Sequence, residues 1–347
     1  MMAREQKHTN DGRTQQALRI RGQRPSGLAL AIRVLRAPFF TASAVPVLLG
    51  TALAWRDGSF HLGYFVLTMV GALAIHSGLN VGNDYFDHLS GNDEANEHPT
   101  PFSGGSRVIQ EGLVTSRQVL AISIAGYVVG IAIGLYLAAT RGWPILWLGL
   151  LGVFFAVFNS APPLRLSYVG HGLAELGVGV GFGPVTVLGA YYVQTQQLSA
   201  TAAWASLPVA ILIVAVLYIN EFPDYAADKA TGKQTPVVLL GRPRAVWGYV
   251  LLIAASYVAV VVEVALGIVP LLWLLALLSL PLGYRAIRCA TQCYDADKNP
   301  DADENPDADE NPPVQQLLPA NAATVQMHLL VGLLLSLGLI LNGLLSV

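Results

Sequence analysis

The sequence predicts an all-α fold, a polytopic membrane bundle of nine transmembrane helices. Of its 347 residues, 54% are hydrophobic and 12% are charged, whereas soluble domains carry about 25% charged residues. The charges are gathered between long apolar runs, and about 20 apolar residues are needed to cross the hydrocarbon core as a helix. None of the runs alternates with the period of two that a membrane β-strand requires. Helices are therefore expected, because they satisfy their own backbone groups in lipid.

The nine runs follow one another with short connections. Gly142-Trp143-Pro144 separates the third and fourth runs, and the stretch from Gly267 to Pro270 separates the seventh and eighth. Such glycine and proline breaks favour tight helical hairpins. The runs cover residues 36–55, 61–82, 118–139, 143–161, 172–193, 203–222, 245–267, 269–288 and 325–346.

Lysine and arginine predict the orientation. With the N-terminus in the cytoplasm, 18 of the 20 Lys and Arg residues fall in cytoplasmic segments, and only Arg56 and Arg141 fall outside. This is the bias expected of a multi-pass protein of the cytoplasmic membrane. An odd number of helices then places the C-terminus outside the cell.

Two segments are expected to lie outside the packed bundle. Residues 1–27 are polar and basic and predict a disordered tail before a membrane domain over 28–347. Residues 295–312 are three consecutive hexapeptides of the type Asp-Ala-Asp-x-Asn-Pro. Eight acids and a proline at every sixth residue predict a solvated, disordered insertion. A calcium-binding repeat remains an alternative, although the glycine of known calcium loops is missing.

The remaining acidic residues gather in two motifs at the predicted cytoplasmic ends of the second and sixth helices. Each motif contains Asn-x-x-x-Asp, and residues four apart lie on one face of a helix, one turn above each other. Stacked carboxylates repel unless a cation lies between them. Polar helix caps are the alternative interpretation, but a cap needs one such residue. The motif residues are Asn83, Asp84, Asp87 and Asp93 in the first, and Asn220, Asp224 and Asp228 in the second.

The ligand types in both motifs favour Mg²⁺. Oxygen ligands without His or Cys are typical of Mg²⁺, which is commonly held by one or two carboxylates together with substrate phosphates. Two such motifs facing each other would hold metal ions around one diphosphate. Basic residues that can bind phosphate lie nearby, namely Arg107 after a Gly-Gly-Ser stretch, and Lys229 and Lys233 around Gly232.

These motifs resemble the two signatures of the UbiA superfamily of intramembrane prenyltransferases. The similar stretches are Asn83-Asp84-Tyr85-Phe86-Asp87 with Asp93, and Asp224-x-x-x-Asp228 followed by Gly232-Lys233-x-Thr235. Other stretches are similar to the branch that prenylates 1,4-dihydroxy-2-naphthoate in menaquinone biosynthesis, among them Gly104-Gly105-Ser106 and the loop from Ala161 through Arg165. The chain departs from that branch at Arg107, at Phe158 and in the acidic repeats, so 4-hydroxybenzoate or another quinone or lipid precursor stays open as the acceptor.

The resemblance implies Mg²⁺-dependent transfer of a polyprenyl group from its diphosphate to an aromatic acceptor. It implies that Asp87, Asp224 and Asp228 are catalytic. The implied metal ligands are Asp84, Asp87, Asp93, Asp224 and Asp228. The implied substrate-binding residues are Asn83, Arg107, Arg165, Asn220, Lys229 and Lys233.

Two further interpretations concern what lies inside the membrane. His76 precedes the first motif in the second helix, where it either lines the acceptor pocket or packs as a satisfied core residue. A cation-coupled transporter is the rival from another class, since transporters are often built from repeats. Their coupling sites lie near the membrane midplane, however, whereas these acids lie at helix ends on one side.

Overall fold

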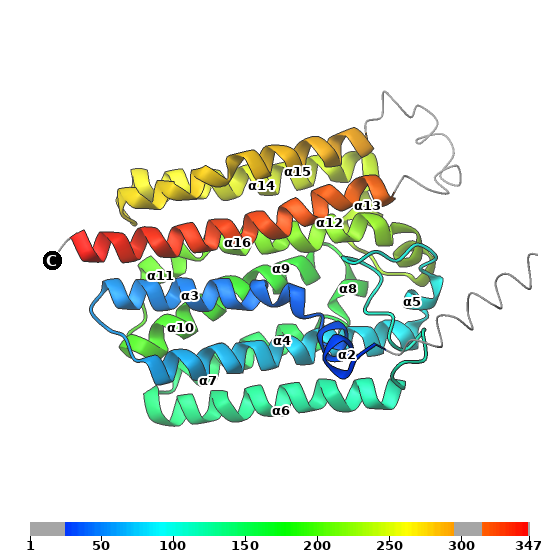
Figure 1. The fold of residues 1–347 in the computed structure, drawn as a ribbon, viewed down its shortest axis with the longest axis horizontal. Helices are drawn as coiled ribbons and strands as arrows, with labels where there is room; N and C mark the ends of the chain where they lie inside the picture. Colours follow the sequence, from blue (N-terminus) through cyan, green and yellow to red (C-terminus); the bar gives the residue numbers. More distant parts are fainter. Residues whose placement is uncertain (1–24, 295–313, 346–347) are drawn as a thin grey trace, which may run out of the picture.

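The computed structural model describes residues 25–294 and 314–345, and Figure 1 shows them as a bundle of roughly parallel and antiparallel helices. The described residues contain no β-strand. The acidic repeats and nearly all of the basic N-terminal tail lie outside the described residues. The all-α fold expected from the sequence is confirmed.

Several spanning segments are built from more than one helical piece. The elements in chain order are α2 (Gly27–Val34), η1 (Ala37–Phe40), α3 (Thr41–Arg56), α4 (Leu62–Ser90), α5 (Asn92–Ala95), α6 (Ser116–Arg141), α7 (Pro144–Phe158), α8 (Leu166–Val169), α9 (Leu173–Val180), η2 (Gly181–Val185), α10 (Thr186–Thr195), α11 (Ala200–Ala205), α12 (Leu207–Thr231), α13 (Pro236–Leu240), α14 (Arg242–Ala265), η3 (Leu271–Ser279), α15 (Leu280–Cys293) and α16 (Val314–Leu345).

The expected count of nine spanning helices is not confirmed. Within the described residues, eight helical segments are long and apolar enough to cross a membrane. The fourth expected span corresponds to α7, which has 15 residues and therefore a length of about 22 Å. It starts at Pro144, after the Gly142 break, and ends before the Pro162-Pro163 loop, so both ends are fixed by residues that cannot continue a helix.

The helices that carry the acidic motifs are longer than their apolar runs. The α4 helix continues through the first motif to Ser90, and α12 continues through the second to Thr231. Both end at a glycine with positive φ, Gly91 at 76° and Gly232 at 82°, a conformation that glycine adopts without strain. Four of the five motif acids therefore lie on the last turns of these two helices, where Asp224 and Asp228 are stacked as the four-residue spacing predicts, whereas Asp93 lies on α5.

Small residues allow the helices to approach closely, as is common in membrane bundles. Between α4 and α6, a side chain at Gly126 would come within 2.8 Å of the Gly78 backbone nitrogen. The Ser123 hydroxyl donates to the Gly78 carbonyl at 2.7 Å in the same contact. On the other side of the bundle, Tyr249 and Trp273 are fully buried among α12, α14 and α16. The ends of α4 and α12 are thus fixed by tightly packed helices.

The two ends of the bundle differ in charge. Arg56 ends α3 and Arg141 ends α6 at one end, together with the described end of α16. At or near the opposite end lie the other basic residues of the described segments and both acidic motifs. Here α2 lies across the bundle and is seen nearly end-on in Figure 1, while the spanning helices run horizontally in the picture.

Candidate active site

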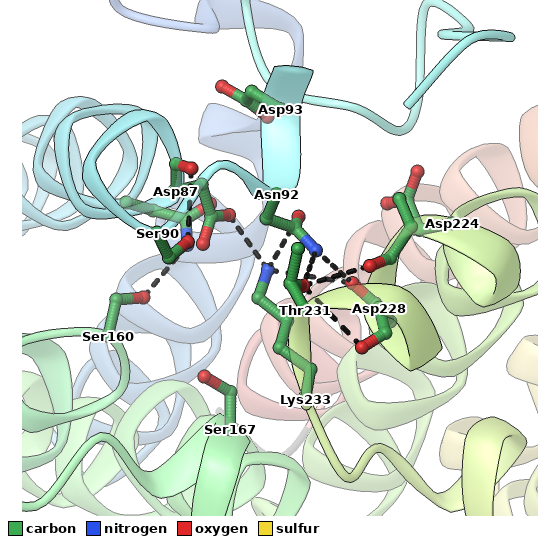
Figure 2. Close-up of polar contacts among 12 residues, drawn as sticks. Asp87, Ser90, Asn92, Asp93, Ser160, Ser167, Asp224, Asp228, Thr231 and Lys233 are labelled. Carbon is green, nitrogen blue, oxygen red and sulfur yellow. Dashed lines mark hydrogen bonds and ion pairs between the residues drawn. The ribbon is translucent and has the colours of Figure 1, made fainter. Parts of the chain in front are cut away.

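The two acidic motifs meet at Lys233. Its ammonium group donates to Asp87 Oδ2 at 2.9 Å and lies 3.7 Å from Asp228 Oδ1. Asp87 and Lys233 are 146 residues apart in the chain, and Figure 2 shows the carboxylates of both motifs facing the same ammonium group. The Gly232 turn that ends α12 returns the chain toward α4 and so places Lys233 between the two helices. All three side chains are buried.

Two asparagines of the short α5 segment link the motifs further. The Asn92 side-chain amide donates to Asp228 Oδ1 at 2.9 Å, and its carbonyl oxygen accepts from Lys233 at 3.0 Å. The Asn96 amide donates to Asp224 Oδ1 at 2.7 Å. Both asparagines lie next to the first motif in the sequence, and each side-chain amide orients one carboxylate of the second motif.

The loop from Gly104 to Arg107 covers the acids with backbone donors. Gly104 N–H donates to Asp224 Oδ2 at 3.2 Å, and Ser106 N–H lies 3.3 Å from both Asp84 oxygens. Gly104 and Gly105 have φ of 74° and 71°. A side chain at Gly105 would lie 2.8 Å from Asp93 Oδ2. Glycine is thus required here both by the backbone conformation and by the close approach of a carboxylate.

Basic side chains surround this loop. Arg107 donates to the Asp93 carbonyl oxygen. Arg36, which the sequence did not single out, lies 3.8 Å from Asp84 Oδ1. Arg36 has a left-handed φ of 50° between α2 and η1, which turns the chain into the bundle at this point. A basic residue at the start of the first apolar run would have been the signal for it, but the preference of basic residues for the cytoplasmic side alone explains such a residue.

Burial and charge shift the pKa values of the groups outside the spanning helices. Burial, and then the neighbouring Asp87 and Asp84, raise the pKa of Asp93 to about 8. Burial would lower the pKa of Lys233, but Asp87 and Asp228 outweigh it and raise that pKa above its usual value. Lys233 is therefore a permanent cation in the site.

The remaining residues expected from the sequence are placed differently. Asn83 donates to the Ser160 hydroxyl at 2.8 Å, and Asn220 accepts from Asn321 at 2.7 Å, so both join neighbouring elements rather than the Lys233 cluster. Lys229 is exposed, with its ammonium 5.7 Å from the ring centre of Tyr225. Arg165 lies over the Tyr168 ring at 5.3 Å, and its buried Nε has no hydrogen-bond partner among the described residues.

A largely apolar cavity of about 300 Å³ lies along α4, where its lining reaches Leu79, one turn before Asn83. It is lined by Asn159, the neighbour of the Ser160 that binds Asn83, and by His76, two turns before Asp84 on α4. The cavity extends between α4, α6, α7 and α10 to Val193 near the other end of the bundle. The His76 Nδ1 atom lies 2.9 Å from the Ser43 hydroxyl, and the ring packs against Phe182 at 4.9 Å. His76 thus lines the cavity and is also held by its neighbours.

The donor set fits Mg²⁺ as a bound ion. Within the described residues, no three Asp, Glu, His or Cys side chains converge into a metal site by themselves. Asp87 Oδ1, however, is buried without a hydrogen-bond partner there, and leaving such an atom unpaired is unfavourable. All candidate ligands are oxygen atoms, which Mg²⁺ prefers. The ion commonly completes its coordination shell with substrate phosphates and water.

The fold and the site together define a polytopic helical membrane protein with an acidic, cation-bridged site at one end of the bundle and an apolar cavity between its helices. A sequence profile described as the UbiA prenyltransferase family matches residues 43–302. The chain belongs to this family.

Known proteins show the same relationship. The chain is 28% identical over 334 residues to 1,4-dihydroxy-2-naphthoate octaprenyltransferase of Bacillus subtilis, which covers 96% of this chain and 98% of the relative. It is 29% identical to 2-carboxy-1,4-naphthoquinone phytyltransferase of Synechocystis, over 78% of this chain and 85% of the relative. A UbiA homologue from Archaeoglobus fulgidus, solved with GPP and Mg²⁺, has the same fold, with a TM-score of 0.53 and 14% identity over 88% of this chain and 99% of the other.

Proposed function

We propose that this protein transfers a polyprenyl group from polyprenyl diphosphate to 1,4-dihydroxy-2-naphthoate, in the cytoplasmic membrane and with Mg²⁺. The carrying observation is that carboxylates from α4 and α12 meet at Lys233, and that an apolar cavity lies along the same helix α4, starting one turn before Asn83 at Leu79. An acidic site of this kind suits a diphosphate with its cations, and the cavity suits a chain of hydrocarbon units. The naphthoate acceptor is supported by two relatives whose names give naphthoate or naphthoquinone substrates and which align over 96% and 78% of this chain.

In this proposal the basic residues bind the diphosphate. Lys233, Arg107 and Arg36 lie around the acids on three different segments. When bound, Mg²⁺ would be held by the motif carboxylates and would supply further positive charge against the diphosphate. The allylic carbon–oxygen bond breaks with its electron pair passing to the diphosphate, and preorganised cations stabilise the charge that develops there.

The second half of the reaction takes place in the cavity. The acceptor ring attacks the allylic carbon to form the new carbon–carbon bond, and the naphthoate carboxyl group leaves as carbon dioxide. The cavity wall below the site is apolar apart from groups such as His76 and Asn159, so water is kept from the allylic cation.

The bundle ends support a cytoplasmic site. The basic residues at the motif end predict that this end and the N-terminus face the cytoplasm, and the C-terminus the opposite side. Residues 1–27 and 295–312, which lie almost entirely outside the described residues, are proposed to have no catalytic role. Family membership favours the enzyme over the transporter.

The test uses purified protein with a polyprenyl diphosphate and a panel of aromatic acceptors. We expect turnover with 1,4-dihydroxy-2-naphthoate that stops on adding EDTA and is restored by Mg²⁺. The double variant Asp87→Ala/Asp228→Ala should be inactive, whereas Glu97→Gln, which changes an exposed acid, should match the wild type. Turnover that survives EDTA or the double variant would overturn the mechanism, and preference for another acceptor would overturn the acceptor assignment.

A further inference from the structure

The short helix α2 has two faces of different character. Its outward side carries Leu28, Ala29, Ala31 and Ile32, all exposed, with Leu28 74% and Ile32 45% accessible. Its inward side places Val34, which is 4% accessible, against Val108 and Val81 of the first-motif region. An exposed helix face made only of apolar side chains is unusual unless another apolar phase covers it.

The position of α2 indicates that the phase covering its apolar face is the lipid bilayer. The helix lies across the motif end of the bundle (Figure 1) and is followed, after Leu35 and Arg36, by the first spanning segment, Ala37–Arg56. The outer face is therefore continuous with the lipid-covered surface of the bundle. A helix in this place, with an apolar side and a basic residue on its last turn, has the properties of an interfacial helix.

The last turn of α2 also holds the loop that covers the acids. Arg33 Nε donates to the Ser106 carbonyl oxygen at 2.9 Å, and its Nη1 donates to Glu111 Oε2 at 2.7 Å. The N–H of the same Ser106 points at both Asp84 oxygens. The Arg33 guanidinium thus binds both Ser106 within the loop and Glu111 after it, and through Ser106 it fixes the backbone donor above the first motif.

We propose that α2 is a bilayer-surface helix that docks its outer face on the lipid interface and holds the Gly104–Arg107 loop over the acidic site through Arg33. Arg33 is a positioning residue, since it acts on the site through Ser106. The lipid contact is independent of the reaction, whereas the effect on the site rests on the proposed function, because it assumes that this loop helps to bind a diphosphate.

The lipid contact is tested with a fluorophore on the full chain in nanodiscs. A bimane label is placed at Leu28→Cys in a Cys289→Ser/Cys293→Ser background, with Glu97→Cys as the matched exposed site on the same end of the bundle. With phosphatidylcholine brominated in its acyl chains, the label at position 28 should lose most of its emission and the label at 97 should keep it. Equal quenching of both labels by aqueous iodide, or self-quenching that shows a second copy on this face, would overturn the assignment.

The effect on the site is tested by calorimetric binding of inorganic pyrophosphate with Mg²⁺, which needs no turnover. Arg33→Ala should weaken binding about tenfold, the effect of losing one hydrogen bond from a charged donor. Arg33→Lys keeps the charge but loses the planar fork, so it should restore only part of the affinity. Glu111→Gln keeps the hydrogen bond from Arg33 to Ser106, so this variant should bind pyrophosphate nearly as tightly as the wild type does.

The outcomes separate the inference from the function. If Arg33→Ala lowers thermal stability but leaves the pyrophosphate affinity unchanged, Arg33 is only structural and the positioning role is wrong. If pyrophosphate binding responds as expected but no aromatic acceptor is prenylated, the positioning role stands and the proposed reaction is wrong.

Discussion

At Lys233, a single ammonium group is shared by carboxylates from two helices. Its removal would leave Asp87 and Asp228 buried without their common counter-charge, and uncompensated buried charge is strongly unfavourable. We expect Lys233→Ala to lower kcat/KM by about 10²–10³-fold, the range for losing one preorganised group that stabilises developing charge. Steady-state kinetics at saturating Mg²⁺ measure the effect.

Lys229 provides the control for this prediction. It is the same residue type four positions earlier, but its side chain is exposed over Tyr225. Lys229→Ala should therefore retain activity close to that of the wild type. Equal losses in both variants would show that positive charge in this region matters, and not the shared contact at Lys233.

The raised pKa of Asp93 predicts that the Mg²⁺ concentration needed for activity changes with pH. Its pKa of about 8 means that the metal-free protein holds a proton there at neutral pH, and a bound cation must displace it. The Mg²⁺ concentration for half-maximal activity should therefore fall as pH rises toward 8, by about tenfold per pH unit if one proton is displaced. Asp93→Asn should flatten this dependence, and an unchanged slope in that variant would contradict the assignment.

The same pKa has a consequence for the metal-free fold. Because the folded value lies above the unfolded value of about 3.9, the folded state binds the proton more tightly. The free energy of unfolding should thus fall as pH rises through the interval between those values. Mg²⁺ should oppose this loss, which thermal unfolding with and without EDTA would measure.

The sequence predicts the acids of the site but not the residues that join them. Asp87, Asp224 and Asp228 are visible because they repeat at helical spacing in an apolar chain. Asn96 and Arg36 are not, because their roles depend on contacts with Asp224 and Asp84 that form only in the folded bundle. Asn83 and Asn220 share the motif pattern, yet they bind Ser160 and Asn321.

At the scale of elements, the Gly104–Arg107 loop tolerates few changes. Gly105→Ala adds a methyl group 2.8 Å from Asp93 Oδ2 at a residue whose φ is 71°. Gly112→Ala meets a similar φ of 67° but open space. Both variants should lose about 1–2 kcal/mol of stability from the left-handed conformation, but only Gly105→Ala should also lose Mg²⁺-dependent activity. Parallel thermal unfolding and activity assays distinguish the two effects.

Helices were easier to predict than their lengths. Apolar runs locate every span, but they end where the polar motifs begin, whereas α4 and α12 continue through those motifs to Gly91 and Gly232. The polar turns remain helical because their side chains find partners on other elements. The end of the fourth run was predicted three residues too late, since α7 ends at Phe158 and the polar residues Asn159 and Ser160 follow it.

At the scale of the whole molecule, the cavity predicts selectivity for chain length. Gly189 on α10 lines the cavity, and a side chain there would meet open space, toward the end remote from the acids. Gly189→Leu should reduce kcat/KM for long polyprenyl diphosphates more than for geranyl diphosphate, because the added side chain occupies the volume that only a long chain needs. Kinetics with a series of chain lengths test this.

Gly63→Leu is the matched control for cavity filling. Gly63 is also helical and faces open space, but it is exposed and does not line the cavity. Chain-length preference should be unchanged in this variant. A shift of equal size in both variants would show that the preference is set elsewhere.

The short α7 helix affects the surrounding lipid as well as the protein. Its length of about 22 Å is less than the hydrocarbon thickness of about 30 Å, and Trp143 and Trp147 are exposed at its beginning. Acyl chains next to α7 must therefore compress, since aromatic anchors resist withdrawal from the headgroup region. Because α7 also forms part of the cavity wall, this hydrophobic mismatch acts directly on that wall. The thickness of the host membrane should therefore affect the shape of the cavity.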